Sequence, residues 1–183
     1  MKLLLSLVTA ALIVGLAGCK TDRATTLIAT LSAVSSASSV AIAVASSLEM
    51  DGQIAEDTAR QIIAYAQAVS DACAQSVAKL NAGGTTRDQA LEILSAVVRV
   101  QAPVAAVYGN AKAHAVVAAL EAALAALKVQ LQKAAQDGKP TRAKLTLDSR
   151  QEAELGRAGR QAEISAATAA GWLKQHPVLA AAR

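Results

Sequence analysis

Residues 32–47 read SAVSSASSVAIAVASS, a stretch of small and branched apolar side chains without a charge. No charged residue occurs between Ala24 and Leu48. Apolar or small residues recur there at alternating intervals of four and three, the heptad spacing of a helix seam. They are Leu27, Leu31, Val34, Ser38, Ala41, Ala45 and Leu48. The stretch predicts a long central helix over residues 25–50, whose small side chains let a second helix approach closely.

The composition predicts helices along the rest of the chain. It has 46 alanines in 183 residues, three prolines and no phenylalanine. Alanine is the strongest helix former, and glycine and proline separate one helix from the next. Four further helices are predicted, at residues 53–81, 86–109, 110–136 and 149–175. Pro103 should kink or end the third, and its full break is placed at Gly109-Asn110.

Each further helix is predicted to bury one stripe. The second has Ile62, Ala66, Val69, Cys73, Ser76 and Leu80; the third Leu91, Leu94, Val97, Val98 and Val104; the fourth Ala113, Val117, Leu120, Leu124, Leu127, Leu131 and Ala134. Thr86 with Gln89 fits a capping box, Asn110 suits an N-cap, and Ser149 with Glu152 opens the last helix. Short connections between matched helices favour antiparallel neighbours. The predicted fold is an all-α, antiparallel up-and-down bundle of four to five long helices, the fifth packed alongside four core helices.

The first residues follow a different pattern. Lys2 supplies a positive charge, residues 3–14 are apolar apart from Ser6 and Thr9, and residues 15–18 are mostly small. This order is typical of a signal peptide. Residues 3–18 are also fewer than the roughly 20 apolar residues that a membrane-spanning helix needs. The last four residues before the charged run, Leu16-Ala17-Gly18-Cys19, resemble the lipobox of bacterial lipoproteins.

The resemblance to bacterial lipoproteins implies cleavage before Cys19 and attachment of lipid, such as palmitate, to its thiol and new amino group. Stable anchoring takes more than one acyl chain, and mature lipoproteins of this kind carry three. In that family an aspartate after the cysteine holds the product at the inner membrane, whereas here Lys20 follows. The resemblance therefore implies the periplasmic face of the outer membrane. A second interpretation is an ordinary secretory signal, cleaved after Ala10 or Ala17, with Cys19 incidental.

On the lipoprotein interpretation the chain has three parts. Residues 1–18 are a signal peptide that is removed, residues 19–24 are a lipidated tether, and residues 25–183 form one helical-bundle domain. Without the signal peptide, 17 basic residues face 14 acidic ones. Residues 128–183 hold 10 basic and 5 acidic residues, while residues 20–127 hold 7 and 9. The basic third suits contact with anionic lipid or cell-wall polymer, or it is a solvated face with interspersed acids.

The residue types that carry chemistry do not form a recognisable site in the sequence. His114 and His176 are the only histidines, and neither has a second metal ligand at helical spacing. No serine lies in a G-x-S-x-G motif, and three aromatic residues, Trp172, Tyr65 and Tyr108, are too few for binding nucleic acid by stacking. We therefore expect no catalytic residue, no metal, no nucleic acid and no cofactor other than the covalent lipid on Cys19.

Three remaining features allow two interpretations each. Cys73 is either an inert core cysteine or a reactive or disulfide-forming thiol. Gly156 and Gly159, among Arg150, Arg157 and Arg160, are either a close helix contact or an anion site. Trp172 either plugs the end of the bundle or contacts a partner or membrane. In each case we favour the first.

The alternation of alanine-rich helices after the lipobox resembles uncharacterised helical-bundle lipoproteins. That resemblance implies a lipid-anchored envelope protein that is not an enzyme and acts as a scaffold or binds a protein partner. The alternative is a membrane-active protein, related to phage or toxin envelope proteins, that inserts its uncharged first helix. The sequence specifies neither the partner nor the oligomeric state.

Overall fold

The computed structural model describes residues 23–82, 87–99, 109–136 and 147–177. These ranges contain the helices α2 (Arg23–Met50), α3 (Glu56–Asn81), α4 (Arg87–Val98), α5 (Ala111–Gln136) and α6 (Ser149–Gln175), and no strand. The predicted all-α helical bundle is confirmed. The predicted signal peptide, Cys19, the Thr86 cap and the Pro103 kink lie outside the described residues.

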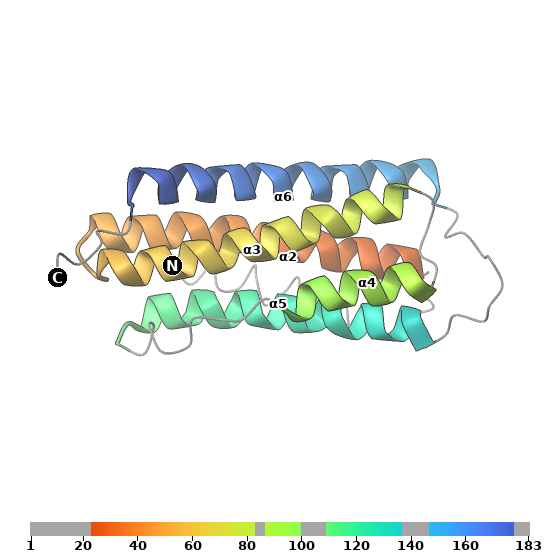
Figure 1. The fold of residues 1–183 in the computed structure, drawn as a ribbon, viewed down its shortest axis with the longest axis horizontal. Helices are drawn as coiled ribbons and strands as arrows, with labels where there is room; N and C mark the ends of the chain where they lie inside the picture. The colour runs from red at the N-terminus through yellow and green to blue at the C-terminus, as the bar shows by residue number, and fades with distance from the viewer. Residues whose placement is uncertain (1–22, 83–86, 100–108, 137–146, 178–183) are drawn as a thin grey trace.

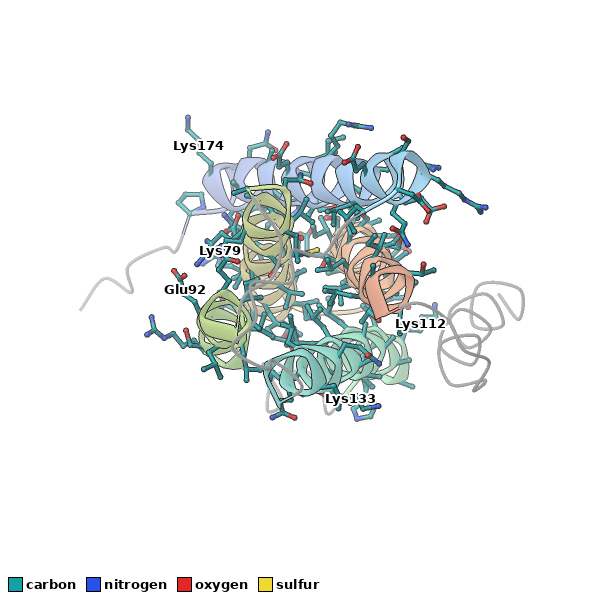
Figure 2. All side chains as sticks on the ribbon, turned by 90° about the vertical axis from the view of Figure 1, so that its right-hand side faces the viewer. Lys79, Glu92, Lys112, Lys133 and Lys174 are labelled. Atoms are coloured by element: carbon teal, nitrogen blue, oxygen red, sulfur yellow. The ribbon has the colours of Figure 1, made fainter. Side chains whose placement is uncertain are left out.

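The helices form three layers. Seen end-on in Figure 2, α6 lies on one side, α2 and α3 form the middle, and α5 and α4 lie on the other side. α2 packs against α3, α5 and α6, and α3 packs against all four of the other helices, so these two are the central helices of the bundle. α6 covers both middle helices, so it is an integral layer rather than a helix added to four others. In Figure 1 each helix runs opposite to the one before it, which makes α2 and α6 parallel.

All seven positions of the seam predicted for α2 are buried. The exposed fractions of its seven side chains do not exceed 5%, the value at Leu27. The six predicted positions of α3 are also buried, as are those of α5 from Ala113 to Leu131. Tyr65 also lies in the core, with 5% of its side chain exposed. Its burial, together with the negative charge of Glu121, raises the pKa of the Tyr65 hydroxyl to about 12.

The predicted stripe of the third helix is confirmed at Val97, is partly buried at Leu94 and is wrong at Leu91. Leu91 is 44% exposed, whereas Ala90 and Ile93 are buried, together with Val97. Of the two leucines, Leu94 packs against the core, whereas Leu91 points to solvent because Ala90 and Ile93 occupy the buried side of the helix. α4 also ends at Val98 instead of continuing to Gly109. The side chains of Val98 and Val104 lie outside the described residues.

Local hydrogen bonds fix where the helices begin and end. Asn110 Oδ1 accepts from the backbone N–H groups of Lys112 and Ala113, at 3.0 and 3.1 Å, which confirms the predicted N-cap of α5. α6 is capped by Asp148 and not by Ser149: Asp148 Oδ1 accepts from the Gln151 N–H at 2.8 Å, and Gln151 Oε1 accepts from the Asp148 N–H at 2.9 Å. Both pairs fit the capping-box spacing. Only Asp148 as the cap places Gln151 against α2, where it also bonds Thr25.

Candidate functional site

The residue types that could carry chemistry are distributed over separate parts of the bundle. Cys19, the predicted lipidation site, lies outside the described residues. Cys73 lies in α3, His114 in α5 and His176 at the end of α6. Within the described ranges, no three His, Cys, Asp or Glu side chains cluster in a way that could hold a metal ion.

Cys73 is an interior thiol. Its side chain is fully buried in the core, and its Sγ donates toward the carbonyl oxygen of Leu31 in α2 at 3.5 Å. Burial raises the pKa of the thiol to about 12, so at neutral pH it stays protonated and a poor nucleophile. The favoured interpretation of Cys73 as an inert core cysteine is therefore confirmed.

The buried thiol should make stability fall in the alkaline range. Folding raises the Cys73 pKa from 9.0 to about 12, so its contribution is complete below pH 9.0 and is lost as the pH rises toward about 12. Between about pH 8 and about pH 10, we expect the free energy of unfolding to fall by about 1 kcal/mol more in the native chain than in Cys73→Ala. Urea unfolding at both pH values measures this difference. Equal losses in the two chains would contradict it.

The two histidines lie on opposite sides of the middle layer. His114 is exposed in the first turn of α5. The ring of His176 stacks on Trp172, with ring centroids 3.9 Å apart and planes at 10°, and its Nδ1 lies 2.9 Å from the Trp172 carbonyl oxygen. Trp172 is half-buried and packs against the core. These contacts close the last turn of α6, as expected for the plug interpretation of Trp172.

Arg60, which the sequence did not single out, joins α3 to the end of α6. Its Nη2 donates to the Pro177 carbonyl oxygen at 3.0 Å and to Glu56 Oε1 at 2.8 Å. A second carboxylate, Asp57, lies 3.6 Å from Nη1. The guanidinium thus anchors the C-terminal end of α6 beside the first turn of α3. No sequence pattern could indicate this contact, because its acceptor is a backbone carbonyl 117 residues away.

A hydroxyl-rich seam joins α2 to α6. Ser39 Oγ and Ser165 Oγ are 2.5 Å apart, and Gln161 Nε2 donates to Ser39 Oγ at 2.7 Å. One turn earlier, Ser35 Oγ donates to the Ala158 carbonyl oxygen at 3.2 Å. Neither histidine reaches this seam, since His176 lies 11 residues beyond Ser165, roughly 16 Å along α6. The hydroxyls bond one another and the backbone, and neither histidine lies beside them, so in the described part of the chain their role is to hold two helices together.

Gly159 marks the closest approach of α6 to α3. A Cβ atom built on Gly159 would lie 2.7 Å from Val77 Cγ1, closer than side chains tolerate. The favoured interpretation as a helix contact is confirmed for Gly159 and is wrong for Gly156, where a Cβ atom would meet only Arg160 Nη1 of the same helix, at 3.5 Å. Arg157 and Arg160 are exposed, and Arg150 Nε bonds Glu154 Oε1 on the surface at 3.1 Å. The basic side chains thus lie on the solvent side of α6, while Gly159 faces the bundle.

Comparison with protein-family models, with curated proteins and with solved structures gives no match to this chain. Among the described residues, two helical stretches are long and apolar enough to cross a membrane, Ala24–Met50 and Ala111–Lys133. A buried core helix passes the same test, and the first stretch is one of the two central helices of the bundle. The second stretch lies in α5, on the outside of the bundle.

Proposed function

We propose that this chain is a lipid-anchored protein of the bacterial cell envelope, whose helical bundle serves as a non-enzymatic scaffold or binds a protein partner. The observation that carries the proposal is the lipobox-like run Leu16-Ala17-Gly18-Cys19 after an apolar signal-like segment. Lys20 at the following position favours the outer membrane, with the bundle facing the periplasm.

The interior of the bundle supports a structural role. Cys73 is protonated in the core, and the Ser39 and Ser165 hydroxyls are engaged in the contact between α2 and α6. The ring of His176 packs on Trp172. Each of these potentially reactive side chains therefore contributes to packing or to a helix end. What the bundle offers to other molecules is its outer helix surfaces.

The anchor is tested by growing cells that express the full chain with an alkyne-bearing fatty acid. We expect the chain to take up the label and to sediment with outer membranes after separation of the two membranes. Cys19→Ser should lose the label, because it removes the thiol that forms the thioether. Cys73→Ala, the matched control, should keep it. Labelling that survives Cys19→Ser, or an unlabelled native chain, would contradict the anchor.

The scaffold role is tested by a pull-down from detergent-solubilised envelopes with the full, lipidated chain. We expect a protein of the same envelope to be retained in a stable ratio to the chain. Variants with charge on the outer surface of one helix should lose it while the core variant Cys73→Ala retains it. Failure to retain any partner, together with a measured hydrolase activity of the purified chain, would overturn this role.

The apolar length of α2 supports a second candidate function, insertion of this helix into a bilayer when the bundle opens. α6 contacts α2 in part through hydrogen bonds of serine and glutamine side chains. Two side chains of α2 also bond their own helix: Ser38 Oγ donates to the Val34 carbonyl oxygen at 3.0 Å, and Thr30 Oγ1 to that of Thr26 at 2.8 Å. Such bonds satisfy hydroxyls in lipid as well as in protein. Insertion would, however, give up the contacts of α2 with α3 and α5, so we rank this function second.

The side chain of Ala43 is exposed in the bundle, so a charge at this position should affect membrane insertion without affecting folding. Under the second function, the domain without its lipid floats with liposomes, and Ala43→Asp abolishes flotation while helix content and unfolding midpoint stay unchanged. A charge at Val40, which is half-buried, acts in the same direction. A domain that stays in solution and leaves liposomes intact would exclude insertion.

A further inference from the structure

The side of α5 that faces away from the bundle is apolar along most of its length. We call it the outer face of α5; its residues are Ala111, Ala115, Ala118, Ala122, Ala125 and Val129. All six side chains are exposed, Val129 to 45%. The described part of the chain places no other helix over this face, which forms the lower edge of the bundle in Figure 2.

The spacing on the outer face is that of a helix-pairing seam. Its residues follow one another at intervals of four, three, four, three and four, the heptad pattern that lets a second helix pack lengthwise. The side of a helix that faces solvent normally carries polar side chains. α6 does so, with Arg157, Glu163 and Lys174 exposed. α5 instead has a buried seam on one side and an apolar seam with the same spacing on the other.

Charges beside the outer face indicate what covers it. Glu121 and Lys128 are seven residues apart and therefore lie along the same edge of α5. The other edge carries Lys112, Ala119, Ala126 and Lys133, which are also seven residues apart. In an antiparallel pair of identical helices the same edges meet. The Glu121 carboxylate of each copy then lies near the Lys128 ammonium group of the other, which gives two opposite-charge pairs. In a parallel pair the two different edges meet, so Glu121 faces Ala126 of the other copy and Lys128 faces its Lys133.

We propose that the outer face of α5 binds the outer face of a second copy of this chain, antiparallel and about a two-fold axis near Ala125. In this register Glu121 of each copy lies opposite Lys128 of the other, and Ala122 lies opposite Val129. Small side chains along the seam allow the two helix axes to approach closely. An anionic lipid surface would be attracted by Lys112, Lys128 and Lys133 and repelled by Glu121, but it would leave the reciprocal Glu121–Lys128 pairs of two copies unmade.

The mass of the full chain in density-matched detergent, measured by sedimentation equilibrium, tests the pairing independently of the lipid anchor. We expect a dimer that dissociates on dilution. Ala125→Glu at the axis should give a monomer, whereas Ala68→Glu, at an exposed alanine of α3, should leave the dimer intact. A native chain that stays monomeric at tens of micromolar would overturn the proposal.

Charge exchange tests the orientation without removing any side chain from the seam. Glu121→Lys or Lys128→Glu alone should weaken the dimer about tenfold, since each creates two like-charge pairs at the axis-related positions. The double exchange restores both opposite-charge pairs and should return the dissociation constant to within about threefold of the native value. If the double exchange is weaker than either single one, the antiparallel register is wrong.

Disulfide trapping in membranes identifies the occupant. Ala125→Cys lies near the proposed axis and should give a covalent dimer of this chain on mild oxidation, while Ala68→Cys should not. The native Cys73 is buried and should not contribute. Trapping of a different protein at position 125, or the spectrum of a lipid-buried probe at that thiol, would overturn the pairing of two copies.

Discussion

Replacing Ile93 with alanine is expected to lower the free energy of unfolding by about 2–5 kcal/mol, the range for truncating a fully buried branched side chain. Ile93 is 2% exposed and lies in the contact of α4 with α5 and α3. α4 has only 12 residues, so it has few other large side chains with which to keep its place. Chemical unfolding followed by circular dichroism measures the change.

The control is Leu91, two residues away and of the same volume. Its side chain is 44% exposed, so Leu91→Ala should change the free energy of unfolding by less than about 0.5 kcal/mol. The pair of variants tests the phase of α4 directly. Equal losses, or a larger loss at Leu91, would show that the helix buries the side that carries Leu91.

Gly159→Ala is expected to destabilise the bundle by about 1–3 kcal/mol, although alanine is the better helix former, because overpacking outweighs the gain in propensity. The new methyl carbon would lie 2.7 Å from Val77 Cγ1, so α6 would have to move away from α3. α6 holds the bundle mainly through small side chains, and a shift at this point loosens its contacts with both middle helices.

Two variants isolate this close contact. Nothing lies within 4 Å of a Cβ built on Gly171, so Gly171→Ala should stabilise the chain by about 0.5–1 kcal/mol through helix propensity alone. In a Val77→Ala background the obstructing Cγ1 is gone, and Gly159→Ala should become neutral or stabilising. A Gly159→Ala variant as stable as the native chain would mean that the contact between α6 and α3 accommodates a methyl group without strain.

The parts of the fold that were predicted correctly are those in which a single repeated pattern determines which side of a helix is buried. The run from Leu27 to Leu48 repeats over seven positions, so its buried side is unambiguous. α5 repeats from Ala113 to Leu131, and its phase was also correct. Glycines and prolines marked the ends of the long helices to within a few residues. Long repeats average out single misleading side chains, and this is why the class of the fold could be predicted.

The errors occur where two residues compete within a short span. In α4 Leu91 was chosen over Ala90 and Ile93, since 12 residues hold only three turns in which to judge a phase. At the start of α6, Asp148 and Ser149 each have a suitable partner three residues later, and the choice depends on a contact of Gln151 with Thr25 across the bundle. Sequence alone does not contain that contact.

The burial or close packing of single residues could be predicted from the sequence, but contacts between distant side chains could not. The burial of Cys73 followed from the stripe of α3, and the close contact at Gly159 from glycines inside a helix. The hydroxyl seam could not be predicted, because Ser39 and Ser165 are 126 residues apart and meet only once α2 and α6 lie parallel. The same limit applies to Arg60, whose partner is the Pro177 backbone.

Because α2 and α6 are parallel, the two ends of the bundle differ, and one of them lies nearer to Cys19. Both helices begin where α3 and α5 finish (Figure 1). Cys19 precedes Arg23 by four residues, which reach at most about 14 Å, so the proposed anchor would draw this end to the lipid surface. The opposite end, with the turn at Gly52, the cap at Asn110 and the close of α6 at Pro177, lies roughly 42 Å away along α2. In the proposed antiparallel pair, the end nearer to Cys19 in one copy lies beside the opposite end of the other, so the two anchors would sit at opposite ends of the pair and hold it lengthwise along the lipid surface.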